Sequence, residues 1–472
     1  MGITVDIDQL LNPRHSVFSE KQRKILLHCD RAMVGCLYIL IFFLPISNAI
    51  IDSAAFAILP AFLVKRGIIY SVVLRQYRKY IAPPSIIRRF LIFLKSLKPI
   101  KNVLNGIILL MAIVILFNLF LNHLPFLGIR KFVSRFSKEI LLYFVFIETI
   151  NSPARFYRFL SVLLLSFMLV MSDAIFQHFT KNSFVFHHPC TTGRVDGPSH
   201  LPNDLGTYVI TILPFCLGLL TYNWMRFRKK DDAANFMRQE LPLDNKWIIS
   251  ILFFLAMCVL GLTFSRSAWM GFLFAVLFLI LTDRDWKGSF LKAAIFVCFF
   301  VIFSNLFAKI RTDIFHAPNL IYQEFFNFSP RLVYWDSALK VIQAHPILGS
   351  GYGQYVLTLK KMNLGPFEYP HNCYLHMAAE IGLVGLAVFG MMMIRFFHWT
   401  LRRIRLIPHI EPRMIVLGLL AGLFAFLVDS FSDTAFTSLK LSTLMWIMMG
   451  SIVALQRIET EKSNHPLEKG KL

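Results

Sequence analysis

The sequence predicts an all-α polytopic membrane protein with about twelve transmembrane helices, and three observations carry this prediction. Of the 472 residues, 56% are hydrophobic and 48 are phenylalanine. Apolar runs near the ~20 residues that a helix needs to cross a bilayer recur along the whole chain. Lysine and arginine, which give a net charge of +22, cluster between these runs. Because basic loops of membrane proteins face the cytoplasm, this charge is explained without nucleic acid, and we expect membrane lipids around the chain.

The first half of the chain is expected to cross the membrane six times within a single integral membrane domain, 1–472. Its N-terminal segment is basic, which predicts a cytoplasmic N-terminus. Between Lys65 and Lys101 there are ten Lys or Arg and no acid, which predicts a basic cytoplasmic loop over 65–102 that lies along anionic lipid. The expected spans of this half are 32–51, 53–72, 103–122, 136–152, 157–178 and 205–224.

The second half adds six spans, so that both termini are expected in the cytoplasm. Spans seven and eight meet near Arg266, the ninth covers 290–308, and the tenth begins just after His371. This order predicts that 180–204 faces outside, and that 309–371 forms a large outer loop between helices 9 and 10. Four cations then also fall outside, against the usual charge bias: Arg130, Lys131, Arg135 and Lys138.

The stretch that begins span ten is the strongest candidate for chemistry. Pro370 stops the preceding segment, and Asn372 is a suitable N-cap for the helix that follows. His371 then lies at the positive end of the helix dipole, which favours a neutral imidazole, the form needed in a general base. The alternative is a surface histidine next to a helix cap. Gly382 and Gly385 fall on one helical face, where small residues let another membrane helix approach closely.

Three arginines are expected on the same outer face, and the functional interpretation of each is weighed against a purely structural one. Arg194 lies in a glycine-rich loop, where Asp196 could pair with it. Arg266 follows a long apolar run and lies between two serines, although an arginine at a membrane boundary often only extends toward the headgroups. Arg331 occupies the first turn of a predicted helix, where a cation opposes the helix dipole without visible compensation.

The remaining polar residues give weaker signals. Glu380 lies within span ten, so its carboxylate must be paired or near water; it could orient His371 or pair with an arginine. Asp429 and Asp433, near the outer end of span eleven, are interpreted as structural. The seven cysteines show no CxxC spacing, and we expect neither a metal nor a cofactor. Whether Cys190 and Cys373 form a disulfide is left as an open question.

Together, three outer arginines and one basic histidine indicate a substrate with clustered negative charge and a hydroxyl group to activate. The planar fork of arginine matches phosphate oxygens. A membrane enzyme of this kind is expected to use a lipid-linked diphosphate donor. A transporter or flippase of lipid-linked glycans is the competing class, but it would show repeats or charges at the bilayer midplane.

The motif His371-Asn372, followed after nine residues by Gly382-x-x-Gly385, resembles the signature of the bacterial O-antigen ligase and O-antigen polymerase superfamily. Other landmarks are similar and come in the same order: the Arg194–Asn203 loop, Ser265-Arg266, Arg331-x-x-x-Trp335 and His345-Pro346-Ile347-Leu348-Gly349-x-Gly351. The resemblance covers about 190–395. Leu386 departs from the Ser or Thr that often follows the second glycine in the family.

This resemblance implies a twelve-span glycosyltransferase of the lipid-phosphosugar (GT-C-like) architecture in the bacterial inner membrane, with 180–204 and 309–371 in the periplasm. The implied donor is a glycan linked to undecaprenyl diphosphate, held by Arg194, Arg266 and Arg331. His371 is the implied general base, with Asn372, Glu380, Gly382 and Gly385 in support, and no metal is implied. The acceptor is lipid A–core for a ligase, which we favour, or another lipid-linked glycan for a polymerase.

Overall fold

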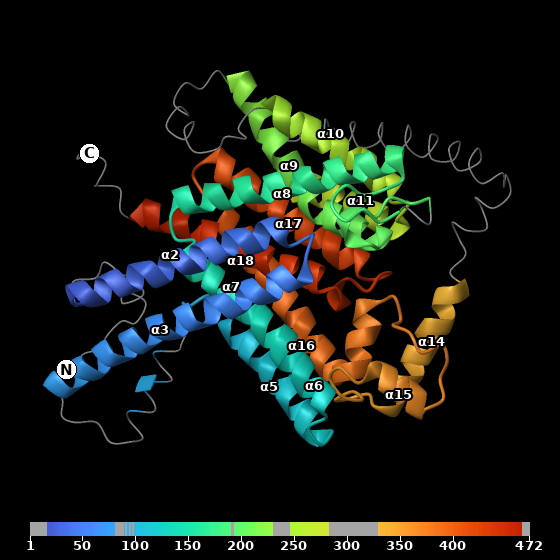
Figure 1. Ribbon diagram of the computed structural model, residues 1–472, viewed down its shortest axis with the longest axis horizontal. Helices are drawn as coiled ribbons and strands as arrows, with labels where there is room; N and C mark the ends of the chain where they lie inside the picture. The colour runs from blue at the N-terminus through green and yellow to red at the C-terminus, as the bar shows by residue number, and fades with distance from the viewer. Residues whose placement is uncertain are drawn as a thin grey trace.

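The computed structural model describes residues 17–80, 99–189, 193–229, 246–282 and 329–464, together with 89, 92, 93 and 96. These residues form helices joined by short loops, with a single isolated β-bridge between Asn182 and Pro189 and no strand (Figure 1). The prediction of an all-helical polytopic membrane protein is therefore confirmed for the described part of the chain.

The N-terminal half supplies one side of the helix bundle. Two long helices, α2 (Glu20–Phe43) and α3 (Asn48–Tyr80), pack against each other. After α5 (Asn105–Leu121), the chain turns into a helix of three consecutive parts: α6 (Phe126–Lys131), the π-helical η1 (Phe132–Ser137) and α7 (Lys138–Thr149). Helix α8 (Pro153–Thr180) follows; Ser152 accepts a hydrogen bond from the amide of Arg155, as expected of an N-cap.

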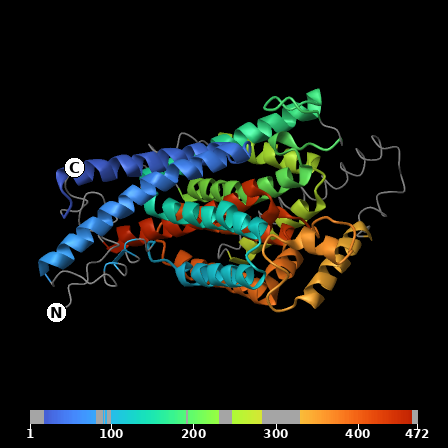
Figure 2. The ribbon, with the colours of Figure 1, turned by 60° about the horizontal axis from the view of Figure 1, so that its bottom comes forward.

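The second half of the chain forms the remaining helices of the bundle and a pair of short helices that packs over one end of it. Its helices are η2 (Gly197–Ser199), α9 (Pro202–Lys229), α10 (Lys246–Leu262), α11 (Arg266–Thr282), α14 (Ser329–Ala344), α15 (Tyr355–Lys361), α16 (Cys373–Ile404), α17 (Ile410–Asp429), η4 (Ala435–Thr437) and α18 (Leu439–Asn464). Seen from the side, the long helices run roughly along one direction, and the orange pair α14 and α15 covers one end (Figure 2).

Helix α17 is the centre of this half, because it packs against α9, α11 and α18. Small residues allow the backbones of α17 and α9 to come close. A Cβ at Gly422 would lie 2.0 Å from the carbonyl oxygen of Thr211, and one at Gly218 would lie 2.7 Å from that of Met414. No larger residue fits at either place, so the glycines fix how closely the two helices pack.

Seven of the described helices are long and apolar enough to cross a membrane: α2, α3 (from Asn48 to Gln76), α8, α9, α16, α17 and α18. Helices α5, α10 and α11 are apolar but shorter, with 17 residues each. Every expected span overlaps a helix, except 290–308, which lies outside the described residues. The number twelve and the sides of the loops stay predictions.

The basic loop expected over 65–102 overlaps the second span. Lys65 and Arg66 lie inside α3, which continues past them to Tyr80, so the first part of this segment is helical, while its cytoplasmic side stays a prediction. Both side chains are buried, because Glu148 of α7 contacts them: Lys65 Nζ lies 2.7 Å from its Oε1, and Arg66 bonds to its Oε2. Asp30 of α2 lies 3.8 Å from the same ammonium group. Partners from other helices thus keep both charges inside the bundle.

We expect Glu148→Ala to destabilise the protein by about 3–5 kcal/mol, because removing one partner leaves buried charges uncompensated. Detergent-induced unfolding of the purified protein measures the change. Glu461→Ala is the matched control, since Glu461 is 58% exposed in its pair with Arg457 and exposed pairs contribute at most about 1 kcal/mol. Equal stability of the two variants would show that the buried cluster contributes nothing.

Candidate active site

The candidate site begins where α16 starts, at the end of the bundle that α14 and α15 cover. Asn372 is the N-cap, as predicted: its side-chain oxygen accepts hydrogen bonds from the amides of Tyr374 and Leu375, both at 3.0 Å. His371 stands just before it in the left-handed region, with φ of 46°. Histidine is one of the few residues found there repeatedly.

The imidazole of His371 faces a carboxylate that follows α17. Its Nδ1 lies 3.8 Å from Oδ1 of Asp433, and the histidine side chain is 36% exposed while that of Asp433 is 7% exposed. Within the described residues, neither Nδ1 of His371 nor Oδ2 of Asp433 has a hydrogen-bond partner. A half-exposed histidine beside a buried carboxylate has the arrangement of a base and its orienting group, and such contacts often tighten only when substrate binds.

A second carboxylate, Asp429, connects this pair to the neighbouring helices. The hydroxyl of Thr207 on α9 donates to Oδ2 of Asp429 at 2.5 Å, and the hydroxyl of Ser267 on α11 lies close to the same carboxylate. The guanidinium of Arg331 on α14 and the carboxylate of Asp433 both lie near enough to act on Asp429 electrostatically. The structure thus brings Arg331 and His371 to one acidic centre at the end of α17.

Arg194 belongs to the loop that packs beside this centre. Its Nε donates to the carbonyl oxygen of Thr263 at 2.8 Å, and its Nη2 donates to Oδ1 of Asn203 at 2.7 Å. Asn203 lies one turn before Thr207 on α9, so Arg194 is held one turn away from the contact with Asp429. Asp196, the expected partner of Arg194, bonds to Gln177 and His188 instead.

Arg266 is the first residue of α11 and is exposed. The serines on either side of it are buried, and their hydroxyl groups lie 3.2 Å apart. Ser267 reaches Asp429, so Arg266 lies next to the same centre. The segments that carry the four candidate residues, Arg194, Arg266, Arg331 and His371, therefore meet near the same ends of α9, α11 and α17.

The two glycines of the motif have a different role from the one expected. Gly382 breaks α16, with φ of 71° and ψ of 179°. A Cβ there would lie 2.1 Å from the carbonyl oxygen of Ile347, so the approaching backbone is that of loop 345–353 and not another membrane helix. At Gly385, the nearest group is the side chain of Ile381 in the same helix.

The loop 345–353 supplies the hydrogen bonds that the helix break leaves open. The amides of Ser350 and Gly351 donate to the carbonyl oxygens of Ala379 and Glu380, at 2.8 and 3.0 Å. In return, the amide of Leu383 donates to the carbonyl oxygen of Pro346 at 2.9 Å. The glycine-rich stretch after His345-Pro346 and the motif around Gly382 are thus two halves of one backbone interlock.

Asn118 of α5 completes the interlock, and the sequence analysis missed it. Its Nδ2 donates to the carbonyl oxygens of Leu348 and, at 3.1 Å, of Glu380, while its Oδ1 accepts from the amide of Tyr352 at 2.7 Å. The side chain is fully buried. A side-chain amide inside an apolar run needs hydrogen-bond partners within the protein. The presence of this polar residue in the run was therefore the sequence signal that could have identified it.

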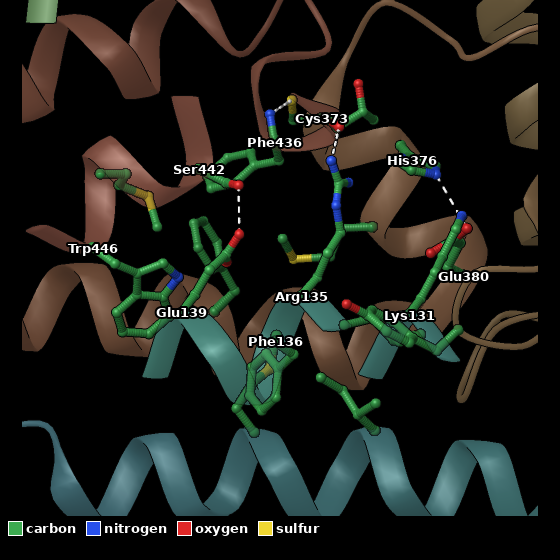
Figure 3. A pocket seen from close by; sticks show the side chains of 18 of the residues that line it. Lys131, Arg135, Phe136, Glu139, Cys373, His376, Glu380, Phe436, Ser442 and Trp446 are labelled. Carbon is green, nitrogen blue, oxygen red and sulfur yellow. Dashed lines mark hydrogen bonds and ion pairs between the residues drawn. The ribbon is translucent and has the colours of Figure 1, made fainter. Parts of the chain in front are cut away.

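Glu380 does not reach His371. Its Oε1 lies 3.2 Å from Nε2 of His376 and accepts a hydrogen bond from the amide of Tyr355 at 3.3 Å. It lines a cavity between η1, α16 and α18 (Figure 3). Among the described residues, no group of three or more His, Cys, Asp and Glu could hold a metal ion. The suggested disulfide involves Cys190, which lies outside the described residues.

Residues 251–390 match a family model described as O-antigen ligase. No curated protein matches the chain. The matched segment contains Arg266, Arg331 and the motif from His371 to Gly385, whereas Arg194 and the acidic centre lie outside it. The match confirms the resemblance carried by the motifs and supports glycosyl transfer of the O-antigen ligase or polymerase kind. Residues 251–390 of the chain are therefore similar to the O-antigen ligase family.

Proposed function

We propose that the protein is an inverting glycosyltransferase that moves a glycan from undecaprenyl diphosphate to a hydroxyl of lipid A–core, at the periplasmic face of the bacterial inner membrane. The observation that carries the proposal is the placement of His371, 3.8 Å from Asp433, at the end of the bundle where the three arginines gather. A base, its orienting carboxylate and a group of cations are what such a transfer needs.

In the proposed reaction, Nε2 of His371 accepts the proton of the acceptor hydroxyl while its Nδ1 faces Asp433. The acceptor oxygen attacks the anomeric carbon of the donor sugar from the side opposite to the diphosphate. The bond from that carbon to the phosphate oxygen breaks, and its electron pair leaves with undecaprenyl diphosphate. The configuration at the anomeric carbon is therefore inverted.

The leaving group carries the negative charge that develops, and Arg194, Arg266 and Arg331 are proposed to match it. Arginine is always charged and offers paired donors to phosphate oxygens, so three of them can replace a metal ion in this role. The bonds from Arg194 to Thr263 and Asn203 fix its orientation before substrate arrives, which lowers the reorganisation needed in the reaction.

A polymerase would break the same donor bond and differ only in its acceptor, so deletion of the gene separates the two functions. We expect the deletion strain to carry lipid A–core without O-antigen, while long glycans accumulate on the polyprenyl carrier. Electrophoresis of lipopolysaccharide, with extraction of the carrier lipids, measures both. Lipid A–core capped with one repeat unit would identify a polymerase, and accumulation of unflipped glycan on the cytoplasmic side would identify a flippase.

A further inference from the structure

A cavity of about 140 Å³ lies between α5, η1, α16 and α18, and the proposed transfer does not use it. A cavity needs only about 10–15 Å³ to hold one water molecule, so this one has room for a small headgroup. None of His371, Asp433, Asp429 and Arg331 lines it. Because its lining includes Cys373 and His376, it lies on another side of the first turns of α16.

The carboxylates of this cavity already have partners. Glu139 accepts a hydrogen bond from the hydroxyl of Ser442 at 2.6 Å, and Glu380 faces His376 and accepts from the amide of Tyr355 (Figure 3). A buried carboxylate that is bonded in this way stabilises the surrounding helices. The acidic groups are thus committed to contacts within the protein.

The cations of the cavity, Lys131 and Arg135, are in a different position. Lys131 acts on Glu380 and Arg135 acts on Glu139 electrostatically, but no ion pair within 4.0 Å joins either cation to a carboxylate of the described residues. The hydrogen bond of Arg135 goes to a neutral group, the carbonyl oxygen of Thr437. The stem of Lys131 packs where a Cβ of Gly353 would lie, 2.6 Å from its Cδ, so the side chain is held beside the cavity.

The local backbone presents both cations to the same space. They stand four residues apart, Lys131 at the end of α6 and Arg135 within the π-helical η1 (Phe132–Ser137), and Figure 3 shows both side chains beside the cavity. Single turns of π-helix are rare and often occur at functional sites. The pair also belongs to the four cations that the expected topology places outside, against the usual charge bias, so a functional reason for their position is needed.

The rest of the lining is apolar and aromatic, and it includes Met111, Ile115, Phe136, Phe389, Met445 and Trp446. Tyr352 adds a hydroxyl group; burial and the charge of Glu380 raise the pKa of this phenol, so it remains protonated at neutral pH. Two cations and a neutral donor above an apolar wall fit an amphiphile with an anionic head. A free anion without an apolar chain would leave the apolar part of the lining without a partner.

We propose that this cavity binds the phosphate-bearing head of a membrane lipid, with Lys131 and Arg135 contacting the phosphate and the apolar wall holding the start of the chains. The site is separate from the one proposed for the donor diphosphate. It does not depend on the proposed transferase activity, because binding alone defines it.

Native mass spectrometry of the full-length protein in detergent tests the proposal with phosphatidic acid, and with diacylglycerol as the same lipid without phosphate. We expect phosphatidic acid to be retained by the unmodified protein, and retention to fall about tenfold or more in the double variant K131Q/R135Q, since charge-assisted hydrogen bonds to phosphate are strong. The control R130Q/K181Q removes two exposed cations outside the cavity and is expected to retain the lipid.

A second measurement keeps the test valid if the double variant folds poorly. Phosphatidic acid with brominated chains should quench the fluorescence of Trp446 in the otherwise unmodified protein, and Trp446→Phe should remove that part of the quenching. Equal loss of lipid in the two double variants, or quenching that Trp446→Phe leaves unchanged, would overturn the proposal. Displacement of the lipid by inorganic phosphate at equal concentration would show that the cavity takes a free anion, and would overturn the assignment to a lipid.

Discussion

Replacing His371 with alanine is expected to lower the rate of glycan transfer by about 10²–10⁴-fold, as for the loss of a general base. Asp433 is not expected to replace the base, because its side chain is 7% exposed and lies on the Nδ1 side of the ring. Transfer from a purified lipid-linked donor, measured in membranes with protein amounts matched, gives the rate directly. Chelators are expected to leave the rate of the unmodified protein unchanged.

The backbone at this position requires a second variant, because φ of 46° disfavours most side chains. Asparagine tolerates the left-handed region well, so His371→Asn keeps the turn and still removes the base. We expect it to be as inactive as the alanine variant. His123→Ala is the matched control: His123 is exposed, has φ of 58°, and belongs to the loop before α6. Near-normal transfer by both His371 variants would remove this residue from the mechanism.

Replacing Gly382 with alanine is expected to destabilise the protein by roughly 2–6 kcal/mol, the sum of backbone strain and overpacking. With φ of 71° and ψ of 179°, this residue occupies a region that is essentially restricted to glycine. The added Cβ would also lie 2.1 Å from the carbonyl oxygen of Ile347, which the interlock holds in place. Detergent-induced unfolding measures the loss, and transfer activity is expected to fall with it.

Gly390→Ala is the matched control in the same helix. Nothing lies within 4 Å of a Cβ built at Gly390, and alanine is the better helix former, so this variant is expected to be at least as stable as the unmodified protein. If Gly382→Ala unfolded at the same detergent concentration as Gly390→Ala, the break in α16 would not be a fixed feature of the fold.

The sequence predicted the helices well, because a bilayer requires apolar runs of similar length and the N-cap of α16 has a local signature in Asn372. The burial of the two charges in α3 could not be predicted, for a physical reason. Lys65 and Arg66 look like the end of a span until Glu148, about 80 residues later, is known to face them. Partners that are distant in the sequence leave no periodic signal.

The candidate site was predicted in part for the same reason. His371 and Arg331 could be selected because each breaks a local rule, and the structure connects them through the end of α17. Asp429 and Asp433 break none, since acids near the end of a span are ordinary, and so they were interpreted as structural. The amide of Asn118 was a visible signal, but only the folded chain shows that it joins α5 to the helix break.

The interlock at Gly382 limits how substrates can enter. Peeling loop 345–353 away from α16 would leave amide and carbonyl groups of both segments without partners in an apolar surrounding, at a cost of several kcal/mol. The cover formed by α14 and α15 is therefore not a detachable lid. The loop bonds to α16 on both sides of Gly382, so any opening at this end has to move loop 345–353 and the adjoining turns of α16 together.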